Sequence, residues 1–225
     1  MDSRGGFIVI DGTDGSGKAT QTKLLIERLV REGYPAETVS FPQYGKKSCG
    51  LVEEYLAGTY GNASEVGPYR ASIFYAADRF DASQTIRCWL EAGKNVVADR
   101  YVGSNMGHQG SKITDPVERG KFFDWEMHLE HELFGIPRPD MNVVLHVPSQ
   151  IAMELMKNRE SKHGLKQDVH EQDPKHLQAA EDAYLDMTKR FESFQLVECV
   201  ENGALLSPET IHERVWKLVQ PYLMK

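Results

Sequence analysis

The sequence predicts an α/β fold in which a five-stranded parallel sheet is covered by helices on both faces. Short apolar runs alternate along the chain with longer segments in which apolar residues recur at helical spacing. Strands joined through helices require right-handed crossover connections, which make the sheet parallel. Neither a linker nor an internal repeat interrupts this alternation, so residues 1–225 are expected to form a single domain.

The first half of the chain supplies three of the expected strands. Gly33 and Gly93 each follow a helical pattern and are typical stop signals, and Pro68 is a typical start. The expected elements are, in order, a strand over residues 7–10, a helix over about 17–32, a strand over 36–40, a short helix near 52–57, a long helix over 68–92 and a strand over 95–99.

The second half supplies the other two strands and a lid. Residues 158–168 are polar, basic and weakly periodic, which predicts a mobile lid at approximately residues 158–170. The expected elements are an aromatic-rich helix from Asp115-Pro116 to Phe134, a strand over 141–147, a helix from Pro148 to the lid, a helix over about 174–194, a strand over 196–200 and a helix over about 208–223.

Composition and charge exclude several classes of protein. The net charge of −7 argues against a general nucleic-acid or membrane-surface binder, and no apolar run approaches the ~20 residues needed to span a bilayer. The three cysteines are far apart and show no zinc or disulfide spacing, which suits a reducing cytosol. We therefore expect a cytoplasmic protein whose partners are small molecules, not nucleic acid or membrane.

A phosphate-binding loop is predicted where the first strand meets the first helix. The pattern Gly12-xxxx-Gly17-Lys18 stands in the strand–loop–helix setting that a P-loop requires. Glycines let backbone N–H groups turn inward, the helix presents its positive end, and Lys18 can follow the terminal phosphates. An ordinary glycine-rich turn is the alternative, and the lysine and flanking elements disfavour it. The predicted ATP site comprises Gly12, Thr13, Asp14, Gly15, Ser16, Gly17, Lys18, Ala19 and Thr20.

Ala19 departs from the P-loop pattern, which places a Ser or Thr hydroxyl for magnesium after the lysine. The other polar residues gather where ligands bind parallel sheets, beyond the carboxyl ends of the strands. They supply many cations and few carboxylates, without a Ser-His-Asp triad or a metal cage. This inventory fits phosphoryl transfer, which depends on positioning and charge neutralisation.

Five motifs make the chain resemble the thymidylate kinases, P-loop enzymes that phosphorylate dTMP with ATP and Mg²⁺. The resemblance spans nearly the whole chain and implies a P-loop NTPase fold and a homodimer. The motifs are Asp11–Lys18, Phe41-Pro42-Gln43-Tyr44, Tyr75-Ala-Ala-Asp-Arg79, Asp99-Arg-Tyr-Val-Gly-Ser-Asn105 and Pro139-Asp140.

The resemblance also implies the catalytic roles. Asp99 would help hold Mg²⁺, and Arg100 would grip the acceptor phosphate, a bidentate task for which arginine is suited. Asp14 would accept a hydrogen bond from the sugar 3′-hydroxyl. The competing interpretations are a plain Asp99–Arg100 ion pair and an Asp14 that braces the loop. The expected catalytic residues are Lys18, Asp99, Arg100 and Arg159.

The dTMP pocket implied by the resemblance draws on four parts of the chain. Tyr75 would stack on thymine, Arg79 would donate to O4, and Asn105 would read the ring edge. Simple core packing is the alternative for Tyr75 and for Tyr184, which would cover the base. The expected dTMP residues are Asp14, Phe41, Pro42, Tyr44, Tyr75, Arg79, Arg100, Ser104, Asn105 and Tyr184.

Three further departures from the family pattern concern the positive charge near the phosphates and the choice between deoxyribose and ribose. Gln43 stands where many relatives place a cation, and His108 stands where some have a tyrosine that disfavours ribose. Gly15 replaces the P-loop arginine of some members, so the arginine is expected from the lid, which offers Arg159, Lys162 and Lys166. A solvated loop is the alternative for these three cations.

Two other functions remain open from sequence. The chain could phosphorylate another nucleoside monophosphate on the same scaffold. It could also be a nucleotide-binding sensor or pseudo-enzyme, and Ala19 is the feature that favours this third possibility.

Overall fold

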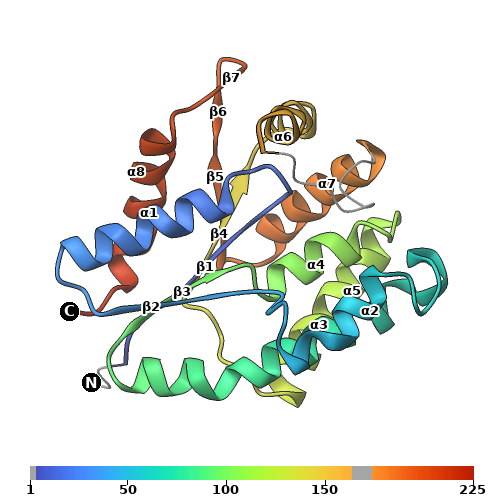
Figure 1. Cartoon of the computed structure of the whole chain (residues 1–225), viewed down its shortest axis with the longest axis horizontal. Coiled ribbons are helices and arrows are strands. Elements are labelled where there is room, and N and C mark those ends of the chain that lie inside the picture. Colours follow the sequence, from blue (N-terminus) through green and yellow to red (C-terminus); the bar gives the residue numbers. More distant parts are fainter. Residues whose placement is uncertain (1–3, 164–173) are drawn as a thin grey trace.

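The computed structural model describes residues 4–163 and 174–225, and the side chains of residues 4–156 and 175–225. Its centre is a five-stranded parallel sheet with the order β2-β3-β1-β4-β5, which confirms the predicted fold class (Figure 1). The strands are β1 (Phe7–Gly12), β2 (Ala36–Ser40), β3 (Asn95–Asp99), β4 (Met141–His146) and β5 (Phe194–Glu198).

Eight α-helices accompany the sheet in the part of the chain that the structure describes. They are α1 (Lys18–Arg31), α2 (Gly50–Leu56), α3 (Ala63–Glu91), α4 (Val102–Gly110), α5 (Pro116–His128), α6 (Ser149–His163), α7 (Pro174–Arg190) and α8 (Pro208–Val219). Shorter elements are the 3₁₀ turns η1 (Lys47–Cys49) and η3 (Gln220–Tyr222), the π-helical turn η2 (Leu129–Leu133), and a hairpin of β6 (Val200–Glu201) and β7 (Ala204–Leu205). No helix among the described residues is long and apolar enough to cross a membrane.

Two apolar cores lie on the two faces of the sheet. Successive side chains of the buried strand β1 point to opposite faces, so Ile8 and Ile10 enter one core while Phe7 and Val9 enter the other. The Ile8 core is closed mainly by α1 and α8, and the Phe7 core by α3, α4, α5 and α7, as the layers in Figure 1 show. This packing fixes the carboxyl ends of β1 and β3 against each other.

Helix α4 was not predicted, because its sequence is rich in glycine. Three of these glycines follow the spacing of one helix face and allow close contacts. A Cβ at Gly103 would lie 2.4 Å from Asp11 Oδ2, one at Gly107 would lie 2.6 Å from the Tyr184 ring, and one at Gly110 would lie 2.7 Å from the Phe123 ring. The glycines therefore let α4 lie close to the end of β1.

Helix α3 begins five residues before the predicted Pro68. Asn62 caps it by accepting hydrogen bonds from the backbone N–H groups of Ser64 and Glu65, and the Glu65 side chain completes a capping box. The chain kinks at Gly67, where φ is 75°. The sequence signal was therefore correct for the segment after the kink.

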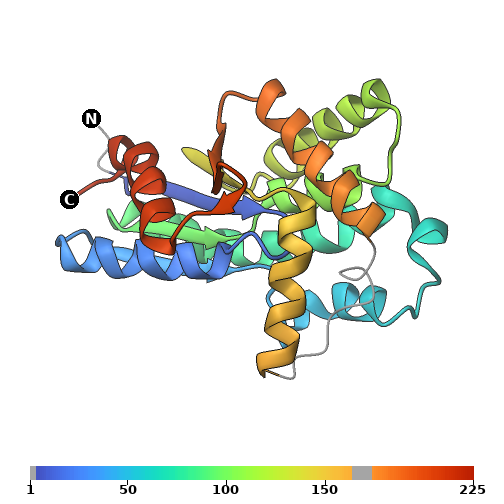
Figure 2. The ribbon, with the colours of Figure 1, turned by 90° about the horizontal axis from the view of Figure 1, so that it is seen from above.

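The predicted end of the helix before the lid is corrected, whereas the lid itself stays a prediction. Helix α6 extends to His163, whereas the sequence predicted an end near residue 158. Residues 164–170 of the predicted lid lie outside the described residues. Figure 2 shows α6 beside the carboxyl ends of the strands, and a Cβ at Gly15 would lie 2.9 Å from the Ala152 carbonyl oxygen of this helix.

Candidate active site

A cavity of about 360 Å³ opens beside the carboxyl ends of β2 and β3. The P-loop, the segment after β2, and helices α3 and α4 contribute its walls. Of the residues predicted to bind dTMP, the cavity is lined by Asp14, Phe41, Pro42, Tyr44, Tyr75, Arg79, Arg100, Ser104 and Asn105.

Tyr184 is the predicted dTMP residue that does not line the cavity. Its ring is buried against Gly107, and its hydroxyl lies 3.3 Å from Ser104 Oγ. It therefore packs against α4, which forms part of the cavity wall.

The P-loop surrounds Lys18 with main-chain oxygens. The Lys18 ammonium group donates to the carbonyls of Gly12, at 3.0 Å, and Thr13, at 2.8 Å, and lies 3.7 Å from Asp14 Oδ1. Burial, with a smaller contribution from the positive charge of Arg100, lowers the pKa of Lys18 to about 8. The hydroxyls of Thr13 and Ser16 are buried and find no hydrogen-bond partner among the described residues.

Two carboxylates end the neighbouring strands β1 and β3. Burial raises the pKa of Asp11, although the hydrogen bond from Ser104 to its Oδ1 opposes the shift. Among the described residues, Asp11 Oδ2 and Asp99 Oδ1 are both buried and without a hydrogen-bond partner. Buried polar atoms are normally paired, so the oxygen of the partly exposed Asp99 remains able to accept a ligand, whereas Asp11 is fully buried.

Arg100 is held between Asp14 and His108. It has a positive φ of 67°, its Nη2 makes an ion pair with Asp14 Oδ1, and its Nη1 lies 3.1 Å from His108 Nε2. Although burial alone would raise the pKa of Asp14, the positive charge of Arg100 holds it well below the usual range. Asp14 and Arg100 therefore form an ion pair that the sequence did not predict, and Arg100 lies on the border between the P-loop and the cavity.

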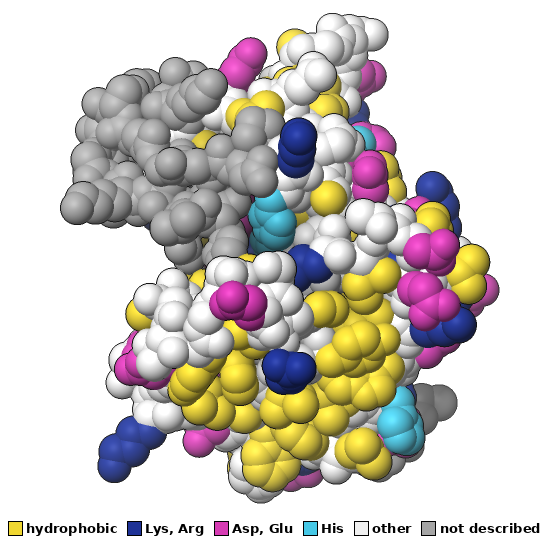
Figure 3. All heavy atoms as spheres, turned by 90° about the vertical axis from the view of Figure 1, so that its right-hand side faces the viewer, with side chains coloured by type: hydrophobic (Ala, Val, Ile, Leu, Met, Phe, Trp, Pro, Cys, Tyr) yellow, Lys and Arg dark blue, Asp and Glu magenta, His cyan; other side chains and the backbone are white. Residues whose placement is uncertain are grey.

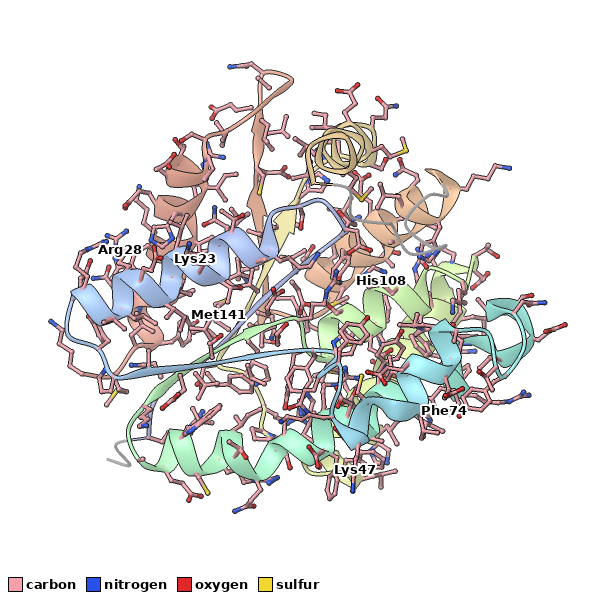
Figure 4. The ribbon with its side chains drawn as sticks, viewed as in Figure 1. Lys23, Arg28, Lys47, Phe74, His108 and Met141 are labelled. Carbon is pink, nitrogen blue, oxygen red and sulfur yellow. The ribbon has the colours of Figure 1, made fainter. Side chains whose placement is uncertain are left out.

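His108 lies on α4 beside this ion pair (Figure 4). Burial lowers the pKa of His108 to about 3, so the imidazole is neutral and its Nε2 accepts a hydrogen bond from Arg100. Its ring also meets the edge of Tyr184, with 6.2 Å between the ring centroids. His108 therefore orients the Arg100 guanidinium through Nη1, while Asp14 holds it through Nη2.

The predicted base-reading residues come from two helices. Tyr75 and Arg79, one turn apart on α3, both line the cavity together with Asn105 of α4. Glu130 binds Arg79, and Glu126 binds Asn105. Sequence reasoning missed both glutamates. The available signal was their spacing of four residues in an aromatic-rich helix, which places both acids on one buried face. Acidic side chains on a buried face need partners.

Sequence reasoning also missed part of the cavity wall. Lys112 donates to the Tyr55 hydroxyl at 2.7 Å and to Gln109 Oε1 at 2.6 Å. Burial lowers the pKa of Lys112 to about 8. Gln109 belongs to the unpredicted helix α4 and Lys112 follows directly after it, so no pattern linked these residues to the site. His176 of α7 completes this side of the cavity.

The cationic lid residues are not placed by the structure. The side chains of Arg159, Lys162 and Lys166 all lie outside the described residues. The catalytic role expected for Arg159 therefore stays a prediction.

Comparison with known proteins gives a consistent result. The family model described as thymidylate kinase matches residues 10–210. The thymidylate kinase of Mycobacterium tuberculosis is 31% identical over 184 residues, covering 80% of this chain and 85% of the relative. The human thymidylate kinase is 30% identical over 149 residues, covering 66% of this chain and 63% of the human protein.

A solved structure supports the fold independently of the sequence. The thymidylate kinase of Candida albicans matches with a TM-score of 0.75, covering 97% of this chain and 92% of that one at 21% identity. The family match includes the P-loop and every cavity-lining segment described above. The chain belongs to the thymidylate kinase family.

Proposed function

We propose that the protein transfers the γ-phosphoryl group of ATP to dTMP, producing ADP and dTDP. The observation that carries the proposal is the position of Asp14 and its partner Arg100. Asp14 belongs to the P-loop and also lines the cavity, and Arg100 is paired with it. A donor held by the loop and an acceptor in the cavity would therefore meet at this ion pair.

The donor side is the loop of residues 12–20. Its inward N–H groups and the N-terminus of α1 suit a polyphosphate. Lys18, now bound to carbonyls of its own loop, can exchange these contacts for phosphate oxygens and neutralise charge during transfer.

The acceptor side is the cavity. Arg100 would bind the phosphate of dTMP, Asp14 would accept from the 3′-hydroxyl, and Tyr75 would stack on the base, with Phe41, Pro42, Tyr44 and Ser104 forming walls. Arg79 would donate to O4 and Asn105 would accept from N3–H. Arg159 would place a positive charge beside the phosphoryl group during transfer. This contact would stabilise the transition state more than the bound substrates.

The residues present also suit Mg²⁺, which prefers oxygen ligands and keeps several waters. Asp99 would hold it, because its buried Oδ1 has no other partner within residues 4–156 and 175–225, and phosphate oxygens would complete the shell. No group of three or more acidic, histidine or cysteine side chains among the described residues could form a metal cage, so the nucleotide must supply ligands. When bound, Mg²⁺ would neutralise charge on the β- and γ-phosphates.

The missing hydroxyl at Ala19 is expected to matter little, because a water can take its place at an ordering cost of ~0–2 kcal/mol. The test is kcat against magnesium concentration. Ala19→Ser should change kcat by less than about tenfold, while Asp99→Asn should reduce it far more. If the wild type is inactive and only the Ala19→Ser variant transfers phosphate, the result would support the sensor alternative.

We further propose a homodimer of single-domain subunits in a reducing cytosol, where the free thiols Cys49, Cys88 and Cys199 would persist. Exposed hydrophobic side chains of α3, namely Tyr69, Ile73 and Phe80, support the dimer. Figure 3 shows a broad hydrophobic area on the side that carries α2 and the first half of α3. A second copy is the occupant we assign to it.

An ADP-release assay over a panel of nucleoside monophosphates tests the proposed reaction. We expect dTMP to give the highest kcat/KM, and Arg79→Ala to reduce dTMP use while leaving the KM for ATP nearly unchanged. Preference for another monophosphate would make the chain a kinase of different base choice. Tight nucleotide binding with no turnover on any member would make it a sensor.

A further inference from the structure

We propose that Glu126 and Glu130 are positioning residues that set the hydrogen-bonding polarity of the base pocket. Glu130 would fix Arg79 as a donor and Glu126 would fix Asn105 as an acceptor. The pocket would then select bases that present a carbonyl next to a ring N–H. This inference rests on the proposed function, and its test can fail while that function stands.

Both glutamates lie behind the cavity, not in it. Glu126 is on α5 and Glu130 is one turn later on η2, and each is fully buried with 0% exposure. Neither lines the cavity, but Arg79 and Asn105 do. Acidic side chains are almost never fully buried unless they are paired, so their partners explain their presence.

Glu130 binds the Nε–Nη2 edge of the Arg79 guanidinium. Arg79 Nε donates to Glu130 Oε2 at 2.7 Å, and Nη2 donates to Glu130 Oε1. A guanidinium has five N–H donors in a fixed plane, so this side-on contact leaves the far end for other acceptors. Arg79 Nη1 makes only a 3.5 Å contact with the Tyr101 carbonyl. The contact with Glu130 thereby fixes the direction of the remaining Arg79 N–H donors toward the cavity.

Glu126 fixes the orientation of the Asn105 amide. Asn105 Nδ2 donates to Glu126 Oε2 at 2.9 Å and approaches the Ser72 carbonyl at 3.4 Å. The Ser72 carbonyl can only accept a hydrogen bond, so the NH₂ group faces these two partners. Asn105 Oδ1 is buried and has no hydrogen-bond partner in the part of the chain that the structure describes. This amide would therefore offer a ligand an acceptor.

A donor beside an acceptor matches one class of base edge. Thymine and uracil present O4 as an acceptor and N3–H as a donor, which complements Arg79 and Asn105. Cytosine presents the reverse pattern, an N4 amine and an unprotonated N3. A site built to pair with one pattern strongly disfavours the other, because its buried polar groups are left unpaired.

The charges of the cluster are compatible with this arrangement. Burial, with a further contribution from the neighbouring Glu130, raises the pKa of Glu126 to about 8. At neutral pH Glu126 is then protonated, while the Glu130 charge is offset by Arg79. A protonated carboxyl still accepts through its carbonyl oxygen, so the contact with Asn105 is kept.

The experiment uses ratios of kcat/KM for dTMP, dUMP and dCMP, measured on one preparation. Such ratios do not depend on the fraction of active protein, so partial unfolding cannot change them. The dUMP/dCMP ratio reports the base edge. The dTMP/dUMP ratio reports the methyl group, which the two glutamates should not affect.

Three variants and one control complete the design. Glu130→Gln and Glu126→Met should each reduce the dUMP/dCMP ratio at least about tenfold and leave the dTMP/dUMP ratio within about threefold. Glu126→Gln keeps an acceptor carbonyl and should retain the wild-type ratios. Glu181→Gln, at a buried glutamate outside the cavity that binds His146, is the control and should change neither ratio.

A paired substitution covers the case in which Glu126→Met does not fold. Asn105→Asp alone places two carboxyl groups together, and above about pH 8, where Glu126 is charged, it should weaken nucleotide use. Adding Glu126→Gln supplies a donor to the new carboxylate, whose other oxygen again faces the base, so the double variant should regain uracil preference. An unchanged dUMP/dCMP ratio in Glu130→Gln and no recovery in the double variant would overturn the inference. A wild type without dTMP preference would instead contradict the proposed function.

Discussion

At the scale of single residues, Lys18 is the group whose surroundings bear most directly on phosphoryl transfer. Its ammonium group is buried within the P-loop and bound to two main-chain carbonyls. We expect Lys18→Met to reduce kcat by about 10³-fold or more, because a contact to the transferring group is lost. Steady-state ADP release, with circular dichroism to check folding, measures the effect.

Lys23→Met is the matched control for this prediction. Lys23 lies on the same helix, but its side chain is 76% exposed, and Figure 4 shows it on α1. Its substitution should leave turnover close to the wild-type value. Near-normal turnover in Lys18→Met would contradict the P-loop assignment.

Glu126 makes a second prediction, about stability and pH. Its pKa is raised from an ordinary 4.5 to about 8 in the folded protein. The unfolded chain therefore loses this proton at lower pH than the folded chain does. The stabilising contribution of the neutral carboxyl is complete below pH 4.5 and is lost as pH rises toward 8.

Glu126→Gln isolates this contribution, because glutamine stays neutral. Between pH 5 and 8 the free energy of unfolding of the wild type should fall relative to the variant by about 2 to 4 kcal/mol. Urea unfolding of both proteins at several pH values measures the difference, and titrations of groups that do not interact with Glu126 cancel in it. Parallel pH profiles would show that Glu126 titrates normally.

At the scale of elements, the sequence predicted those parts of the fold whose signals are local. The strands were located within about two residues. Strands β1, β3, β4 and β5 contain short apolar runs, whereas the more polar β2 was located from the Gly33 stop signal before it and Phe41-Pro42 after it. The P-loop was located because its glycines, lysine and flanking elements are contiguous. Tyr75 and Arg79 share a cavity because one helical turn separates them.

The parts that could not be predicted depend on contacts between distant segments. Gly103, Gly107 and Gly110 indicate a loop in isolation, and only the neighbours that they approach explain a helix. The Arg79–Glu130 pair joins residues 51 positions apart, and Asn105 and Glu126 are 21 apart. Tyr184 matched a family position, but its side chain packs against α4 and does not line the cavity. The spacing of residues along the sequence does not reveal this difference.

Helix α3 makes an element-scale prediction at its kink. Gly67 has φ of 75°, in the region that glycine adopts at little cost, although a Cβ there would meet nothing within 4 Å. At φ 75° and ψ 164° Gly67 lies in a region that is essentially restricted to glycine, so Gly67→Ala should destabilise the protein by about 1–3 kcal/mol through backbone strain alone. The measurement is the urea midpoint at constant m-value.

Gly50 is the matched control for the kink. It lies in α2 with φ of −55°, and a Cβ there would also meet nothing within 4 Å. Gly50→Ala should therefore stabilise the protein by about 0.5–1 kcal/mol, the opposite sign. Equal effects at both positions would mean that the conformation at Gly67 does not cause strain.

At the scale of the whole molecule, the exposed apolar stripe of α3 is expected to determine assembly. Tyr69, Ile73 and Phe80 are 43%, 44% and 55% exposed, and Leu133 beside them is 67% exposed. Phe80 also packs edge-on against Phe134, with 5.7 Å between the ring centroids, so its position is fixed. Contiguous apolar surface of this kind marks an interaction site.

A twofold dimer would bring the same stripe of two subunits together, so each substitution acts twice. Phe80→Glu should therefore raise the dimer dissociation constant by at least about 100-fold, through lost apolar contact and repulsion between the introduced charges. Sedimentation velocity over a range of protein concentrations measures this shift. Val30→Glu is the control, because Val30 is 64% exposed on α1, which packs on the opposite face of the sheet. It should leave the dimer intact, and a wild type that is monomeric at tens of micromolar would refute the assembly proposed for α3.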